Sequence, residues 1–256
     1  MEIHRCRFVE HLPSGVNTLA LNGDSSLLAV GRSNASIEIW NIRHDWILEK
    51  TIPGGENLSV EALVWTKEGR LFSAGHHATI TEWDLVHLRS KVSVDSFGGA
   101  VWSLALNDSG TTLAAACEDG CVRLFDLLDG TLVYKKSLVG DKARILSLSW
   151  QPKSNFVVTG SSEGVIRRWN TVTGLSLLSV HSLRVSHLFG GCLLGRPTHR
   201  MTVDTLKGDK TLVWSVAALE YDDDDLVLFG NKIVFWDSYF SFSFSFCFQG
   251  RHHRFW

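Results

Sequence analysis

The stretch VWSLALNDSGTTLAAACEDGCVRLFDLLDGTLVYKKS, residues 101–137, predicts four short strands separated by turns. Its first run alternates in the manner of a strand, and its second consists of small residues that suit a tightly packed layer. Asp119-Gly120 favours a tight hairpin turn, because glycine accepts a positive φ at no steric cost. The expected strands are residues 101–106, 111–117, 121–126 and 131–137. Together they predict one four-stranded antiparallel meander.

Five units of this kind occur along the chain, each closed by an aromatic residue followed by Asp or Asn. The pairs are Trp40-Asn41, Trp83-Asp84, Phe125-Asp126, Trp169-Asn170 and Trp236-Asp237. The first four recur about every 43 residues, which is the period of a β-propeller blade. We therefore predict an all-β propeller with five recognisable blades, ending near residues 40, 83, 125, 169 and 236. Because most rings with this repeat have seven blades, we expect an incomplete, truncated ring.

Two kinds of residue recur at fixed places in the units and are expected to be structural. The closing aromatic residues Trp40, Trp83, Phe125, Trp169 and Trp236 should pack between neighbouring blades. Gly31, Gly75 and Gly160 stand where the backbone leaves the second strand of their units. Glycine at that place predicts either a positive φ or a close approach of another segment.

The repeat sets the expected domain boundaries. Residues 1–237 are predicted to form the partial propeller, with an insert at 175–211 before the fifth blade. Residues 3–10 are expected to form one further strand that would close a complete ring. Residues 238–256 contain a serine-phenylalanine alternation that departs from the repeat, so we interpret them as a low-complexity tail.

Composition and motifs argue against several classes of function. The net charge of −2 provides no broad basic field for nucleic acid or anionic lipid. No run reaches about 18 apolar residues, so no membrane span is expected. The five cysteines form no C-x-x-C pair, and the sequence lacks a phosphate-binding loop, a G-x-S-x-G and an H-E-x-x-H motif. We therefore expect no enzyme, no catalytic, cofactor or metal site, and no small-molecule substrate.

The N-terminal half resembles the cirhin family, WD-repeat proteins of the small-subunit processome. The resemblance is carried by residues 9–16, 28–33, 37–41, 61–65, 70–75, 95–103, 117–120 and 144–150. It covers residues 3–238, most clearly up to Trp169, and excludes the tail. It implies a scaffold in the nucleus and nucleolus, acting in pre-ribosomal RNA transcription and processing. The implied partners are other processome proteins and pre-ribosomal RNA, contacted directly or through those proteins.

A second function stays open at this point. Trp40-Asn41-Ile42-Arg43 resembles the Trp-Asp-x-Arg box of substrate receptors for cullin-RING ubiquitin ligases, with Asn in place of Asp. In that interpretation Arg43 would project from the propeller to meet an adaptor protein. The purified partners would distinguish the two functions: ligase adaptor and cullin, or processome proteins and pre-ribosomal RNA.

Overall fold

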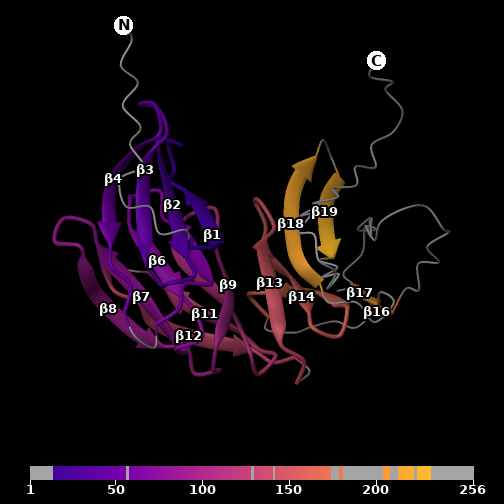
Figure 1. The fold of residues 1–256 in the computed structure, drawn as a ribbon. Coiled ribbons are helices and arrows are strands. Elements are labelled where there is room, and N and C mark those ends of the chain that lie inside the picture. The colour runs from indigo at the N-terminus through magenta and orange to yellow at the C-terminus, as the bar shows by residue number, and fades with distance from the viewer. Residues whose placement is uncertain are drawn as a thin grey trace, which may run out of the picture.

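The chain folds into β-strands and connecting turns (Figure 1). The computed structural model describes residues 14–55, 58–127, 130–140, 142–173, 179–180, 204–207, 213–221 and 224–231. No α-helix occurs among these residues, and so none that could cross a membrane. The predicted all-β class is confirmed. The expected N-terminal strand, Trp236 and the tail lie outside the described residues.

The first three sheets are four-stranded antiparallel meanders with the strands in sequence order. The first contains β1 (Val16–Leu21), β2 (Leu27–Arg32), β3 (Ile37–Asn41) and β4 (Ile47–Ile52). The second contains β5 (Ala62–Trp65), β6 (Leu71–Ala74), β7 (Thr79–Asp84) and β8 (Arg89–Asp95). The third contains β9 (Val101–Leu106), β10 (Thr112–Cys117), β11 (Val122–Asp126) and β12 (Val133–Leu138). These sheets stand where the repeat predicted blades.

The last two sheets differ from the simple meander. The fourth contains β13 (Ile145–Trp150), β14 (Phe156–Ser161) and β15 (Val165–Asn170), followed in space by β17 (Asp204–Lys207) and β16 (Ser179–Val180). Strand β17 is antiparallel to β15, and β16 is parallel to β17. Thus β17 occupies the fourth position of this sheet although it lies within segment 175–211. The fifth sheet pairs β18 (Val213–Tyr221) with β19 (Asp224–Asn231).

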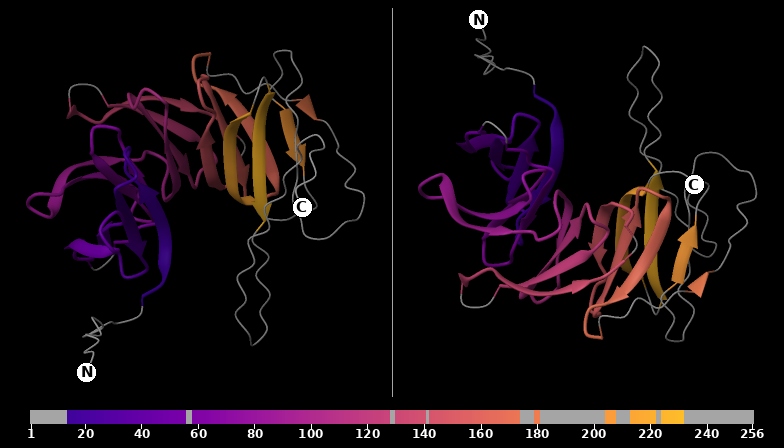
Figure 2. Two further views of the ribbon diagram at one scale, coloured as in Figure 1. Left: turned by 90° about the horizontal axis from the view of Figure 1, so that it is seen from above. Right: turned by 90° about the horizontal axis from the view of Figure 1, so that it is seen from below.

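The sheets follow one another around an arc, as in a β-propeller. Figure 2 shows the first sheet at one end of the arc and β18–β19 at the other. The first strands of successive sheets, β1, β5, β9, β13 and β18, contact one another in that order. They therefore form the inner side of the arc, and the fourth strands form its outer side.

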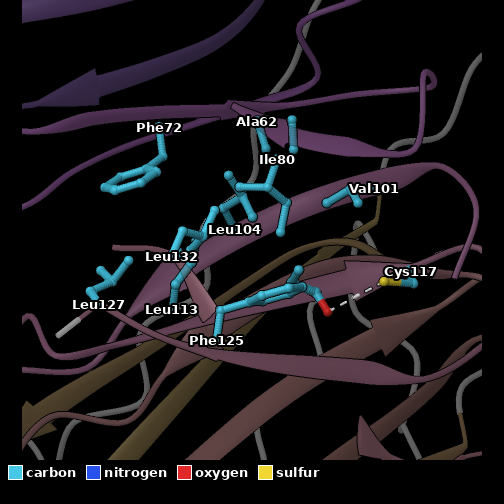
Figure 3. Close-up of a cluster of buried hydrophobic side chains, with 12 residues drawn as sticks. Ala62, Phe72, Ile80, Val101, Leu104, Leu113, Cys117, Phe125, Leu127 and Leu132 are labelled. Atoms are coloured by element: carbon cyan, nitrogen blue, oxygen red, sulfur yellow. Dashed lines mark hydrogen bonds between the residues drawn. The ribbon is translucent and has the colours of Figure 1, made fainter. Parts of the chain in front are cut away.

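Three apolar clusters join successive sheets, because each sheet is apolar on both faces. The cluster between the second and third sheets includes Phe72 and Ile80 from one side and Leu113 and Phe125 from the other, all fully buried (Figure 3). Equivalent clusters lie between the first and second sheets and between the third and fourth. Within the described residues, the apolar clusters of the first four sheets are shared between neighbours, so these sheets depend on one another for burial.

The outward face of the first sheet has no such neighbour among the described residues. Leu19 and Leu21 of β1 are 59% and 52% exposed, whereas Ala29 and Ile39 on the opposite face are buried against the second sheet. The strand register places Leu21 beside Leu28, and Leu28 beside Trp40, on this exposed face. It is the face that the last blade would cover in a closed ring.

The turns between second and third strands share a left-handed residue, but its identity changes along the chain. Gly120 and Gly164 fill this place in the third and fourth sheets with φ values of 83° and 73°. Ala35 and Ala78 fill it in the first two sheets with φ values of 63° and 59°. A methyl group costs about 1–2 kcal/mol in this conformation, so the first two turns are strained relative to the others.

Replacing Ala78 with Gly is expected to raise the free energy of unfolding by about 0.5–1 kcal/mol, because it relieves this strain at some cost in chain entropy. Ala74→Gly is the matched control, since Ala74 is buried within β6. That change should lower the free energy of unfolding by about 1 kcal/mol or more. Urea denaturation of both variants measures the difference. Equal effects at the two positions would contradict the strain at Ala78.

Candidate interaction surfaces

Three of the predicted closing aromatic residues, Trp83, Phe125 and Trp169, lie between neighbouring sheets. Phe125 is fully buried against the second sheet, and Trp169 is 1% exposed against the third. Trp83 is half-buried and packs with the cluster between the first and second sheets. The indole nitrogens of Trp83 and Trp169 donate to Ser73 Oγ and Thr159 Oγ1, each at 2.8 Å. These three side chains are therefore core residues, each packed on the preceding sheet.

Trp40 is placed differently from the other closing aromatics. It is half-buried on the outward face of the first sheet, and its Nε1 donates to Glu38 Oε2 at 2.9 Å. Glu38 also accepts from Arg32 Nη2 at 2.8 Å. Among the described residues, a carboxylate and an arginine thus lie beside this indole.

The repeated glycines allow close packing and do not supply a positive φ. Gly31 lies in β2 and Gly160 in β14, while Gly75 directly follows β6. None of the three has a positive φ. A Cβ at Gly31 would lie 2.6 Å from Thr18 Cγ2 and 2.7 Å from Val60 Cγ1, and one at Gly75 would collide with the Ser59 carbonyl oxygen. Of the two reasons offered for glycine here, close approach is the one that fits Gly31 and Gly75.

Arg43 lies in the turn between β3 and β4, at the rim of the arc that also carries the turns between first and second strands. Its side chain is 59% exposed and lies 3.9 Å from Asp24 Oδ2, and it also donates to the Asp24 carbonyl oxygen. The Asn41 side chain accepts from the Arg43 backbone N–H at 3.1 Å, which fixes the turn. Arg43 is thus accessible and held against Asp24.

The opposite rim carries the turns between second and third strands, and we call it the β2–β3 rim. It comprises residues 32–36, 75–78, 118–121 and 162–164 and the adjoining strand ends. Three arginine–carboxylate pairs lie there: Arg32–Glu38 at 2.8 Å, Arg123–Asp119 at 2.6 Å and Arg144–Glu118 at 3.0 Å. The charges of these pairs balance within the molecule.

Asp119 shows how such a pair is maintained despite burial. Burial alone would raise the pKa of Asp119, but hydrogen bonds from both terminal nitrogens of Arg123 outweigh it and hold the pKa below its ordinary value. The Arg123 side chain is 9% exposed. The pair is therefore charged at neutral pH and fixes the turn between β10 and β11.

Bulges in the first strands turn single side chains out of the ladder at the β2–β3 rim. The register slips between Val16 and Thr18 in β1 and between Ile145 and Ser147 in β13. In β9 it slips where Val101 and Ser103 pair with Cys117 and Ala116, which leaves Trp102 as the extra residue. Bulges commonly serve to redirect a side chain.

Two redirected side chains, Asn17 and Trp102, meet residues of the second sheet. Asn17 Nδ2 donates to Glu61 Oε1 at 3.3 Å, and His76 Nε2 lies 3.3 Å from the same oxygen. The rings of His76 and Trp102 have centroids 4.7 Å apart at 75°. We call Asn17, Glu61, His76 and Trp102 the Glu61 cluster. No signal in the sequence pattern predicts this cluster.

A buried ionic network holds the second sheet together. Glu82 has a side-chain exposure of 2% and accepts from Arg70 Nη2 at 2.7 Å and Lys91 Nζ at 2.8 Å. Arg70 also lies over the Phe72 ring, 5.0 Å from its centroid. Arg70 and Glu82 are largely buried whereas Lys91 is 50% exposed, so the network offers little surface to a partner.

The described part of the chain contains no group of three or more His, Cys, Asp or Glu side chains that could hold a metal ion. Cys117 is fully buried, and burial raises the pKa of its thiol to about 12. Its sulfur is therefore protonated at neutral pH and a poor nucleophile.

The chain is similar to a known protein family and to several known proteins. The WD domain, G-beta repeat family model matches residues 4–41, 91–126 and 132–170. The human U3 small nucleolar RNA-associated protein 4 homolog is 36% identical over 241 residues, covering 93% of this chain and 32% of the human protein. The Schizosaccharomyces pombe and Saccharomyces cerevisiae proteins named U3 small nucleolar RNA-associated protein 4 are 37% and 36% identical, over 96% and 94% of this chain and 34% and 31% of their own length.

The chain contains WD40 repeats and is homologous to these proteins over most of its length. The expected WD repeats are thereby confirmed. The chain spans about a third of the length of the curated relatives it matches.

Proposed function

We propose that this chain is a non-catalytic WD-repeat scaffold in nucleolar assembly of the small-subunit processome, and that it serves pre-ribosomal RNA processing and transcription there. Its partners on this proposal are other processome proteins, and pre-ribosomal RNA either directly or through those proteins. The proposal includes a nuclear and nucleolar location, no cofactor and no small-molecule substrate.

The observation that carries the proposal is the homology to proteins named for association with U3 small nucleolar RNA. The structure adds a physical reason for a scaffold. The apolar residues of its repeats are engaged in joining sheets, so the outer strands and the two rims remain for partners. Propellers act through such surfaces.

Co-purification tests the proposal. The full chain, carrying an affinity tag, is captured from nuclear extract, and U3 small nucleolar RNA is quantified against the tag alone. We expect U3 RNA to be enriched at least about tenfold, together with processome proteins. Absence of U3 RNA, with a ubiquitin-ligase adaptor and cullin as the main proteins recovered, would contradict the scaffold and favour the ligase receptor.

The variant Arg43→Ala distinguishes the processome scaffold from the ligase receptor. Arg43 is exposed and belongs to no apolar cluster of the described residues, so its removal should leave the fold intact. On the scaffold proposal, U3 RNA recovery from Arg43→Ala equals that of the parent chain. On the ligase alternative, adaptor recovery falls at least about tenfold while the fold is retained, as checked by circular dichroism.

A further inference from the structure

The Glu61 cluster gathers four side chains from three sheets at one place on the β2–β3 rim. Asn17 comes from β1, Glu61 precedes β5, His76 lies in the β6–β7 turn and Trp102 lies at the start of β9. Asn17 and His76 contact the same carboxylate oxygen of Glu61, and His76 also contacts Trp102. His76 therefore contacts both a carboxylate and an indole ring.

Within the described residues, Glu61 lacks the cationic partner that comparable carboxylates have. Glu38, Asp119 and Glu118 each have an arginine within 3.0 Å on this rim. In the described ranges the partners of Glu61 are the Asn17 amide and the His76 imidazole, both at 3.3 Å, and an imidazole is charged only when protonated. With a side-chain exposure of 22%, Glu61 remains accessible from solvent.

His77, which follows His76 in the chain, adds no positive charge to the cluster. Burial first, and the nearby His76 second, hold the pKa of His77 below its ordinary value, so its ring is neutral at pH 7. A carboxylate at this place repels phosphate, which disfavours nucleic acid as the occupant. A cation has the complementary charge.

Trp102 supplies the second element of cation recognition. The bulge in β9 places its half-buried indole beside His76, and Nε1 has no hydrogen-bond partner within the described residues. Cations bind over aromatic faces, and a guanidinium also donates in parallel to a carboxylate. Its planar, delocalised charge suits this pair of groups better than an ammonium does.

We propose that the Glu61 cluster binds an arginine side chain presented by a partner protein. Glu61 accepts hydrogen bonds from the guanidinium, Trp102 contacts its planar face, and Asn17 and His76 orient the carboxylate. This inference goes beyond the proposed scaffold function by naming the chemistry of one partner. Its test needs only the purified chain, so a failure of this inference can be distinguished from a failure of the scaffold proposal.

The test is a titration of the ¹⁵N-labelled full chain with Nα-acetyl-arginine amide, following the indole N–H resonance of Trp102. The variant Trp102→Phe assigns that resonance. We expect a saturable shift with the arginine probe and little or none with Nα-acetyl-citrulline amide, its neutral isostere. Nα-acetyl-lysine amide should bind more weakly than the arginine probe.

Glu61→Gln keeps the shape of the side chain and removes its charge, so we expect it to weaken the arginine probe at least about tenfold. Glu163→Gln is the matched control, because Glu163 is an exposed carboxylate on the same rim outside the cluster. It should leave binding unchanged. The proposal is overturned if citrulline and arginine shift Trp102 equally, if no shift occurs, or if both glutamine variants respond like the parent chain.

Discussion

Replacing Trp169 with Ala is expected to lower the free energy of unfolding by about 3–5 kcal/mol. The indole is 1% exposed and fills the cluster between the third and fourth sheets, where it meets residues such as Ala114, Val122 and Leu138. Its loss leaves a cavity and also deprives the buried Thr159 hydroxyl of the Nε1 donor at 2.8 Å. Urea denaturation followed by circular dichroism gives the measurement.

Trp46→Ala is the matched control for this prediction. Trp46 is the same residue type but is 61% exposed in the turn before β4. Its removal opens no cavity, so we expect a change below about 1 kcal/mol. If the two substitutions cost the same, the interpretation of closing aromatics as inter-sheet core residues is wrong.

Replacing Arg70 with Met is expected to cost about 3 kcal/mol, because the buried Glu82 carboxylate loses its bidentate partner and keeps Lys91 as its remaining cationic partner. The double variant Arg70→Met/Glu82→Leu removes both charges, and replacement of a buried pair by apolar residues is often neutral. Most of the lost stability should therefore return in the double variant. A double variant less stable than Arg70→Met would contradict this account of the network.

The same network predicts a dependence of stability on pH. Burial alone would raise the pKa of Glu82, but hydrogen bonds from Arg70 and Lys91 outweigh burial and lower the pKa below its ordinary value. A lowered pKa in the folded state adds stability above the pKa of the unfolded chain, near about 4.3, and that stability is lost as the pH falls. Glu82→Gln should therefore show a smaller loss of stability between about pH 5 and pH 3 than the parent chain.

Periodicity was sufficient to predict the sheets because each unit carries its own pattern. The alternating strands and the closing aromatics recur at a constant spacing, and Trp83, Phe125 and Trp169 lie between sheets. The fourth strand of the fourth sheet could not be predicted in this way. Strand β17 is the four-residue run Asp204–Lys207, which is too short to show a period and is ordered by pairing with β15.

The Glu61 cluster could not be predicted from the sequence for a different reason. Asn17 and Trp102 lie far apart in the chain, and their contact with Glu61 and His76 depends on bulges that change the register by one residue. A hydrophobic pattern predicts a strand, but it does not show whether the pairing register shifts by one residue at the end of that strand. The positive φ of Ala78 was missed likewise, because alanine carries no signal for a left-handed turn.

The way the closing aromatics pack has a consequence for how the chain is made. Trp83, Phe125 and Trp169 each bury themselves against the sheet that precedes them in sequence. During synthesis, the surface that receives each side chain has therefore already left the ribosome when that side chain emerges. Blades can fold one at a time in the direction of translation, and each packs on the preceding blade, which has already folded. Folding in this order shortens the time for which an apolar sheet face is exposed before the next blade packs on it.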